Sequence, residues 1–399
     1  MILKEYLKFC GVTNKDFAKR IGITPVSLSR YISGERLPEK EIILKISSLT
    51  DGAVNPDDFY FKPKIDNDNE NINLNSISEI VKNIRNGSKK ELAKTITLVE
   101  SKLKKHQELV KKIFEKFKTN NKTIRIGVTG VPGVGKSTFI ESIGLKLIQR
   151  NLKVAVLAID PSSKETGGSI LGDKTRMEKL SVHPKAFIRP SPSSGHLGGV
   201  AKKTYESMLC LEEAGYDVIF IETMGVGQAE TAVHDMVDIF LVLLLPSGGD
   251  ELQGIKKGII ELADLIVVNK ADNDLQKAAE ITQNEYKTAL HISGKPKNGL
   301  EVEVLICSSL KSKGLEKIWD YIQVFINKKK KNHTFFSNRQ SQLKEWMWNS
   351  IHQTVNEMIN SDLSKNEFIK KIQLKVDDKK LSVFRATQLM CNFLLKNKF

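Results

Sequence analysis

The sequence predicts an α/β protein in which a doubly wound, mainly parallel sheet is flanked by an all-α N-terminal domain and by helical N- and C-terminal extensions. Between residues 124 and 306, short β-rich runs alternate with helical stretches, as in parallel sheets that carry helices on both faces. On either side of this region, apolar residues recur at three- and four-residue spacing, which is typical of amphipathic helices. At roughly 100–200 residues per domain, the 399 residues allow about two to four domains.

The first predicted domain covers residues 1–62. Gly22 is suited to a tight turn between two helices, and Thr24 can cap the second helix with Pro25 at its first position. The segment FAKRIGITPVSLSRY resembles a helix-turn-helix of the Cro/YdaS kind. The resemblance implies DNA binding, with the second helix in the major groove. The residues that would face the bases are Ser27, Ser29 and Arg30.

The small net charge of this domain leaves a second interpretation open. It carries 10 Lys and Arg against 8 Asp and Glu, so its net charge is 10 − 8 = +2. A DNA-binding domain usually has a basic surface. A helical module that contacts only protein is therefore the alternative.

The remaining segments follow from composition. Residues 63–76 are rich in Asn and Asp and predict a linker, and residues 77–120 predict a helical extension. The alternating β-rich and helical region predicts a third domain at 121–327, and residues 328–399 return to helical periodicity. The run of lysines from Lys328 to Lys331 predicts a solvated link between domains.

The charge is uneven along the chain. Residues 124–326 carry 23 Lys and Arg against 25 Asp and Glu, whereas residues 327–399 carry 15 against 6. Basic ends suit nucleic acid or acidic protein partners. Charged helices facing water are the alternative explanation.

Several classes of protein are excluded by the sequence. No apolar run approaches the roughly 18 residues of a membrane span, and the N-terminus lacks the pattern of a signal peptide. The cysteines stand far apart, without a C-x-x-C pair or a neighbouring His that would complete a zinc site. We therefore expect reduced cysteines and a cytoplasmic location. The cysteines are Cys10, Cys210, Cys307 and Cys391.

A phosphate-binding motif follows the first β-rich run. Residues 130–137, GVPGVGKS, match G-x-x-x-x-G-K-[ST] between a strand and a helix, which predicts a P-loop NTPase. Glycines let backbone N–H groups converge on phosphates at a helix N-terminus. Lys136 would bridge the β- and γ-phosphates, and Ser137 would ligate Mg²⁺. The predicted phosphate-binding residues are Gly130, Gly133, Gly135, Lys136, Ser137 and Thr138.

A second motif predicts guanine specificity. Asn269, Lys270 and Asp272 form N-K-x-D at the end of the run LIVVN. The carboxylate of Asp272 can accept hydrogen bonds from N1–H and the exocyclic amine of guanine, a pair that adenine does not offer. The sequence therefore predicts GTP and GDP as ligands rather than ATP. A further base-contacting loop is expected at Ser308, Ser309 and Leu310, where an ordinary turn is the alternative.

Three acidic residues are candidates for holding Mg²⁺ and the attacking water. Asp160 and Glu222 end β-rich runs, at the edge where doubly wound sheets bind ligands. Asp173 lies in the segment GGSILGDKTRM, where a simple turn or cap is the alternative. Mg²⁺ prefers a few carboxylates together with phosphate oxygens and waters. The candidate catalytic residues are Lys136, Glu222 and Asp160.

Residues 124–290 resemble the MeaB/ArgK family of GTPases, which includes the methylmalonic aciduria type A protein. The motifs that carry the resemblance are GVPGVGKST, AIDPSS, GGSILGDKTRM, IRPSPSSGHLGGV, ETMGVGQ, SGGDELQGIKKGI and NKAD. The resemblance implies that GTP hydrolysis gates delivery of adenosylcobalamin to methylmalonyl-CoA mutase or a related acyl-CoA mutase, and protects that enzyme. It also assigns Ser137, Asp160, Asp173 and Glu222 to the Mg²⁺ site. It assigns Asp250, Gln253 and Lys256 to a mobile switch loop.

The resemblance implies two further properties. Glu222-Thr-Met-Gly225 stands where many GTPases have D-x-x-G, and no Gln follows Gly225, so we expect weak intrinsic hydrolysis that a partner accelerates. We assign no catalytic role to Gln228. In the family the C-terminal helices form a homodimer arm. Trp346, Met347 and Trp348 could form that contact, or they could pack within one protomer.

Rival functions remain. A nickel chaperone is disfavoured because the seven histidines are scattered, and an ATP-dependent transport kinase conflicts with NKAD. The principal hypothesis is a Mg²⁺-dependent GTPase that chaperones a cobalamin-dependent mutase. The alternative is a nucleotide-responsive transcriptional regulator that acts through the helix-turn-helix.

Overall fold

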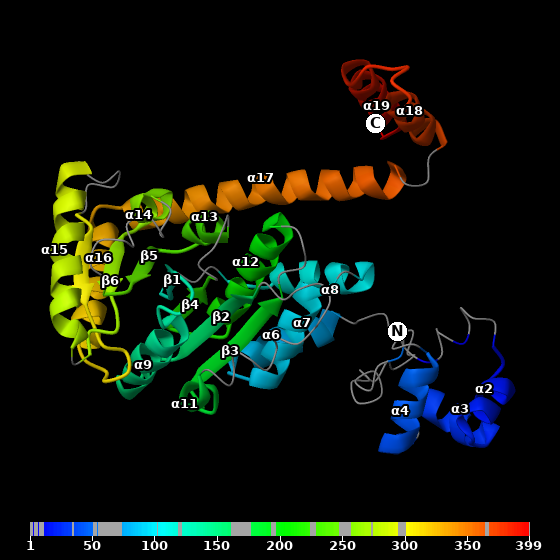
Figure 1. Cartoon of the computed structure of the whole chain (residues 1–399), viewed down its shortest axis with the longest axis horizontal. Helices are drawn as coiled ribbons and strands as arrows, with labels where there is room; N and C mark the ends of the chain where they lie inside the picture. The colour runs from blue at the N-terminus through cyan, green and yellow to red at the C-terminus, as the bar shows by residue number, and fades with distance from the viewer. Residues whose placement is uncertain are drawn as a thin grey trace. The chain divides into compact units, whose positions relative to one another are not determined.

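The computed structural model describes residues 3, 7, 12–33, 36–50, 54, 74–101, 103–118, 122–160, 177–192, 197–223, 229–246, 257–272, 274–293, 301–363 and 367–398. The chain divides into two compact units, Met1–Asn73 and Leu74–Phe399 (Figure 1).

The first unit is a small helical domain with its own core. Its described helices are α2 (Asn14–Ile21), α3 (Pro25–Ser33) and α4 (Lys40–Leu49). Phe17, Leu28 and Ile46 are buried at its centre. Gly22 ends α2 with a φ of 84°, a left-handed conformation that glycine adopts without strain. Thr24 Oγ1 accepts a hydrogen bond from Ser27 N (3.1 Å), which confirms the predicted cap of α3.

The second unit is built on a seven-stranded parallel sheet with the order β3-β2-β4-β1-β5-β6-β7 (Figure 1). This arrangement confirms the predicted doubly wound α/β fold. The strands are β1 (Ile124–Gly130), β2 (Val154–Asp160), β3 (Ala186–Pro192), β4 (Val218–Glu222), β5 (Ile239–Leu244), β6 (Leu265–Val268) and β7 (Glu303–Ile306).

One strand differs from expectation. The sequence pattern does not predict β3, because Pro190 and Pro192 interrupt its run of β-forming residues. Proline cannot donate a ladder hydrogen bond, so it is tolerated mainly at sheet edges. Among the described strands, β3 lies at the edge of the sheet and pairs with β2 alone.

Alternating residues of each strand feed two separate cores. Ile219 and Ile221 of β4 belong to one core and Phe220 to the other, because successive side chains point to opposite faces. Helices α9 (Lys136–Gln149), α11 (Glu178–Ser181) and α16 (Leu315–Lys331) cover the Phe220 face. Helices α12 (Leu197–Glu213), α13 (Ala229–His234), α14 (Lys257–Leu262) and α15 (Leu275–Ser293) cover the other.

A helical extension packs against α12 on the second face. It consists of α6 (Leu74–Arg85), α7 (Lys89–Glu100) and α8 (Lys104–Phe114). Arg85 pairs with buried Glu213 of α12, and Arg189 of β3 pairs with Glu100. Helix α6 begins at Leu74, so the segment predicted as a linker, 63–76, ends earlier than expected.

The lysine run Lys328–Lys331 is not the solvated link between domains that the sequence predicts. These residues form the last turn of α16, so the helix crosses the boundary predicted between 327 and 328. Lys329 is buried and donates a hydrogen bond to Asp238 O (2.8 Å). The chain continues through α17 (Thr334–Leu363), α18 (Glu367–Asp377) and α19 (Val383–Lys398). Among the described residues, no helix has the length and apolar character to cross a bilayer.

Candidate nucleotide site

The P-loop connects β1 to α9 at the carboxyl edge of the sheet (Figure 1). Gly133 and Gly135 have φ of 82° and 93°, in the left-handed region that favours glycine. A Cβ on Gly130 would lie 2.5 Å from Leu243 O, so a side chain there would clash with strand β5. These three glycines bring the loop backbone to the N-terminus of α9, which is the geometry that binds phosphate.

Lys136 folds back over the loop. Its Nζ donates hydrogen bonds to Gly130 O (2.8 Å) and Val131 O (3.3 Å). Thr138 follows in the first turn of α9, where it is half-buried. The ammonium group of Lys136 is thereby held beside the loop that would carry the phosphates.

Ser137 and Glu222 meet across the edge of the sheet. Ser137 Oγ donates to Glu222 Oε1 (2.9 Å), and Glu222 is buried. The register of the parallel strands pairs Val128 with Glu222, which brings the end of β4 next to the P-loop. A hydroxyl and a carboxylate oxygen are ligands that suit Mg²⁺, so these residues fit the ion.

The other proposed metal ligands are placed only in part. The register pairs Ala158 of β2 with Glu222, so Asp160 lies two residues further along, at the same edge. Asp173 lies outside the described residues, as do Gln228, Asp250, Gln253 and Lys256.

Asn269 joins the P-loop to the loop after β7. Its Nδ2 donates to Val134 O (2.9 Å), and its Oδ1 accepts from Ser309 N (3.1 Å) and Ser309 Oγ (2.7 Å). The thiol of Cys307 also donates to Asn269 Oδ1 (3.3 Å). Burial raises the pKa of Cys307 to about 12, so the sulfur keeps its proton and acts as a donor. Sequence reasoning assigned Asn269 to guanine binding but did not foresee this bridging role.

Asp272 and Ser308 are also in contact. Ser308 Oγ donates to Asp272 Oδ1 and accepts from Lys311 N (3.1 Å). Leu310 is 79% exposed at the tip of this loop. The structure therefore brings the NKAD segment and the 308–310 loop together beside the P-loop.

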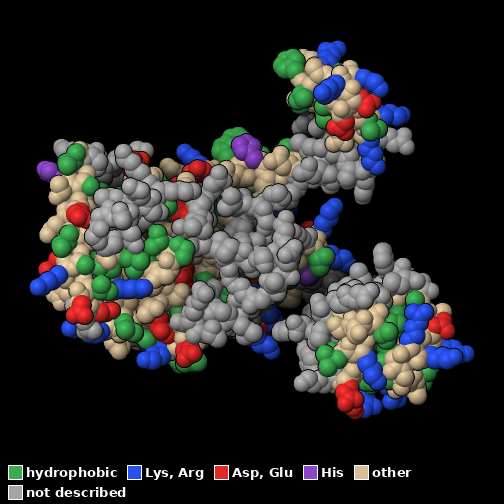
Figure 2. All heavy atoms as spheres, viewed as in Figure 1, with side chains coloured by type: hydrophobic (Ala, Val, Ile, Leu, Met, Phe, Trp, Pro, Cys, Tyr) green, Lys and Arg blue, Asp and Glu red, His purple; other side chains and the backbone are tan. Residues whose placement is uncertain are grey.

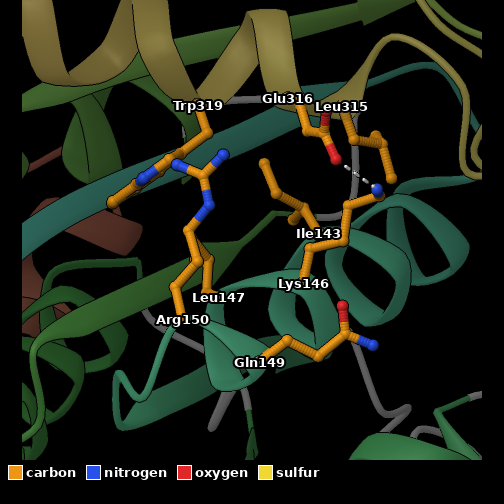
Figure 3. Close-up of a pocket in the computed structure, with 8 residues that line it drawn as sticks. All are labelled: Ile143, Lys146, Leu147, Gln149, Arg150, Leu315, Glu316 and Trp319. Carbon is orange, nitrogen blue, oxygen red and sulfur yellow. Dashed lines mark hydrogen bonds and ion pairs between the residues drawn. The ribbon is translucent and has the colours of Figure 1, made fainter.

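A surface cavity of about 110 Å³ lies elsewhere, between α9 and α16 (Figure 3). Its lining includes buried Trp319 and the ion pair of Lys146 Nζ with Glu316 Oε1 (2.9 Å). Arg150, another lining residue, pairs with Asp320 (3.6 Å). These pairs join the two helices, and none of the predicted nucleotide-binding residues lines this cavity.

Comparison with known proteins identifies the family. The family described as Methylmalonyl Co-A mutase-associated GTPase MeaB matches residues 92–364. This chain belongs to the MeaB family. Its enzymatic activity is therefore that of a GTPase. A helix-turn-helix family matches residues 3–55.

Relatives of this MeaB-family chain cover most of its length. GTPase ArgK of Escherichia coli is 46% identical over 74% of this chain and 89% of its own. The mitochondrial methylmalonic aciduria type A homolog of Mus musculus is 44% identical, with 76% of each chain covered. A crystal structure titled LAO/AO transport system kinase is 36% identical, with a TM-score of 0.64, and covers 82% of this chain and all of its own.

The N-terminal unit presents part of α3 to solvent. Ser29 and Arg30 are exposed, as the helix-turn-helix prediction requires. Ser27 differs, because its Oγ lies 2.9 Å from Thr24 Oγ1 and is engaged in the cap of α3. Val26 is 62% exposed beside them, a feature that we had not predicted. On the visible face of this unit, Lys and Arg side chains lie among apolar ones (Figure 2).

Proposed function

We propose that this MeaB-family protein is a Mg²⁺-dependent GTPase that gates adenosylcobalamin loading of methylmalonyl-CoA mutase, or a related acyl-CoA mutase, and protects that enzyme. The observation that supports the nucleotide chemistry best is the contact of Ser137 with Glu222 beside the P-loop. Family membership supports the mutase as client, since the family is described as mutase-associated.

In this proposal, the chain's own groups divide the work at the phosphates. Lys136 and the P-loop N–H groups neutralise charge that develops on the β- and γ-phosphate oxygens. Ser137 and Glu222, with Asp160 and Asp173, would hold Mg²⁺, which would supply further charge neutralisation. Glu222 and Asp160 are also the groups we propose to orient the attacking water.

Base selection rests on a separate set of residues. Asp272 would accept hydrogen bonds from guanine, and Asn269 fixes the position of the neighbouring loop. Ser308, Ser309 and Leu310 would border the base. The loop with Asp250, Gln253 and Lys256 would report the nucleotide state to the mutase.

The test is GTP turnover by the full-length protein with and without an adenosylcobalamin-dependent mutase. We expect the mutase to raise turnover and Lys136→Ala to abolish it, a loss of at least about a hundredfold. Lys146→Ala is the matched control, because this lysine lies on the same helix but pairs with Glu316 at the surface. Turnover that no mutase changes would contradict the chaperone proposal, and equal binding of GTP and ATP would contradict the base assignment.

We further propose a homodimer formed through α17. Trp346 stacks on Tyr205 of α12 (5.0 Å between ring centroids), so it packs within the protomer. Met347 and Trp348 are 45% and 56% exposed and continue an apolar stripe with Leu343, Ile351 and Val355. Figure 2 shows apolar side chains beside a histidine on the visible face of α17. Replacing Trp348 and Ile351 with Ser should lower the mass measured by light scattering from dimer to monomer, whereas an unchanged mass would contradict this interface.

A second candidate function is nucleotide-responsive DNA binding through the first unit. The observation that favours it is the capped helix α3, with Ser29 and Arg30 exposed. Binding to DNA should weaken steeply with salt, because Lys and Arg contacts to phosphate release counterions. Absence of salt-sensitive binding in both the GTP and GDP states would remove this candidate and leave a protein-contacting module.

A further inference from the structure

Two buried threonines join the strand that opens the P-loop to the strand that ends at Glu222. Thr129 and Thr223 are 0% and 1% exposed, and Thr223 Oγ1 donates a hydrogen bond to Thr129 Oγ1 (2.8 Å). The backbone adds a second link, because Thr223 N donates to Val128 O (3.0 Å). Thr223, the residue after β4, is thus fixed to β1 by one main-chain and one side-chain hydrogen bond, in addition to the strand pairing of β4 with β1.

The threonine pair and the Glu222 carboxylate lie on opposite faces of the sheet. Glu222 reaches Ser137 on α9, which covers the Phe220 face. Thr223 is the next residue, so its side chain points toward the α12 and α13 face. Thr129 shares that face with Gly127. Val233 and Val237, which belong to the same core as Ile219 and Ile221, pack beside Gly127. The carboxylate is therefore held by Ser137 on one face, and its backbone is held by the threonines on the other.

This arrangement suits a residue whose position must not vary. Threonine is β-branched and has few side-chain rotamers, so a buried hydroxyl pair fixes two strands at one spacing. A buried hydroxyl that loses its partner also has no water to replace it. A shift of β4 relative to β1 would therefore break the pair, and the same shift would move Glu222 away from Ser137.

We propose that the Thr129–Thr223 pair is a positioning element that holds the Glu222 carboxylate against Ser137 and so sets how tightly the nucleotide complex retains Mg²⁺. This inference rests on the proposed metal site and adds to it two residues that do not touch the metal. Neither threonine belongs to the predicted nucleotide-binding set.

The test measures release of a fluorescent GDP analogue from the full-length protein, with Mg²⁺ and with excess EDTA. In the native protein, Mg²⁺ should slow release. Thr223→Val keeps the shape of the side chain but removes the hydroxyl, and it should reduce the slowing by Mg²⁺ about tenfold while leaving the rate in EDTA unchanged. Thr223→Ser keeps the hydroxyl and should behave as the native protein does.

The partner residue supplies the internal control. Thr129→Val should match Thr223→Val, and the double variant should be no worse than either single one, because both substitutions remove the same hydrogen bond. The double variant also replaces the pair with two apolar side chains of similar shape. It therefore leaves no buried hydroxyl without a partner, which could destabilise either single variant.

Three outcomes would overturn the inference. A folded Thr223→Val protein with native Mg²⁺ dependence would show that the pair does not position Glu222. Release that quickens equally with Mg²⁺ and with EDTA would assign the pair a merely structural role. If Mg²⁺ fails to slow release from the native protein, the metal site fails first, and the pair's role falls with it.

Discussion

Polar side chains have different kinds of hydrogen-bond partners at the carboxyl edge and at the amino edge of the central sheet. At the carboxyl edge, Lys136 donates hydrogen bonds to backbone oxygens of its own loop, Asp272 accepts from the hydroxyl of Ser308, and Glu222 accepts from that of Ser137. At the amino edge, Arg125 binds Glu212 through two hydrogen bonds (2.7 and 2.9 Å), and Arg339 binds Asp238 in the same bidentate way (2.8 and 2.7 Å).

At the amino edge, the charged side chains are paired with one another within the chain. Burial alone would lower the pKa of Arg125, but its hydrogen bond to Glu212 and the charges of Glu212 and Asp238 raise that pKa above the usual range. Arg339 comes from α17 and also donates to Thr123 O (2.7 Å). Bidentate pairs of this kind fix geometry as well as charge. At the carboxyl edge, a bound nucleotide can therefore replace the present hydrogen-bond partners of the polar side chains. At the amino edge, the ion pairs stabilise the folded domain.

The largest expected effect comes from breaking the amino edge. Arg339→Ala should lower the free energy of unfolding by about 3–5 kcal/mol, because buried Asp238 loses its bidentate ion-pair partner. Urea unfolding of the nucleotide-free protein followed by circular dichroism measures this. Arg150→Ala is the control, since its pair with Asp320 is largely exposed and should contribute less than about 1 kcal/mol. Equal losses in the two variants would contradict the contrast between a buried and an exposed pair.

The carboxyl edge should respond in specificity rather than stability. Asp272→Asn should weaken GTP binding about a hundredfold, because the amide cannot accept both guanine hydrogen bonds. It should improve binding of xanthosine triphosphate, whose extra carbonyl can accept from the amide. Titration calorimetry with both nucleotides measures the exchange, and urea unfolding should change little. Loss of both nucleotides together would instead indicate a collapsed loop.

An effect that appears only as the pH changes concerns Glu206, which lies on α12. Burial raises its pKa to about 7, against the opposing charges of Lys202 and Lys203. Since the folded pKa lies above the unfolded value of 4.5, Glu206 favours folding at low pH, and this contribution is lost as pH rises from about 4.5 to about 7. Glu206→Gln should remove a pH-dependent change in the free energy of unfolding of at most about 3 kcal/mol, measured by urea unfolding at several pH values.

Glu316 provides the opposite sign for comparison with Glu206. Its hydrogen bond with Lys146 lowers its pKa, so its contribution is present above the unfolded pKa and is lost as pH falls through the lower folded value. Glu316→Gln should therefore alter the acid side of the stability profile. If Glu206→Gln changed the free energy of unfolding only at the low pH where Glu316→Gln does, the result would contradict the proposal that burial raises the pKa of Glu206.

Much of the carboxyl edge could be predicted because its residues belong to short local motifs. The glycines, Lys136 and Ser137 lie within eight consecutive residues, and the position of NKAD after a β-rich run predicted the side of the sheet on which Asp272 lies. The amino edge has no such signal. Arg125, Glu212, Asp238 and Arg339 are separated by long stretches of chain, and their pairing depends on the order of the strands.

Other differences have similar physical reasons. A run of lysines indicates solvent exposure on average, but Lys329 buries its stem in the core and extends its ammonium group to Asp238 O. Thr129 and Thr223 appear as ordinary strand residues until the parallel register places them side by side. The exposure of Val26 on α3 depends on which face of the helix the small core uses, which spacing alone did not decide.

The position of Arg339 in the chain has a consequence for synthesis. The first unit has its own core and can fold as soon as its helices have emerged from the ribosome. In the second unit, Asp238 is made about a hundred residues before the arginine that neutralises it, which is several seconds at the usual speed of translation. Until α17 emerges, the base of the sheet carries acidic groups that the finished protein buries. We expect nascent chains to complete this domain only after α17 has emerged, and truncation before α17 to leave the domain open to chaperones and proteases.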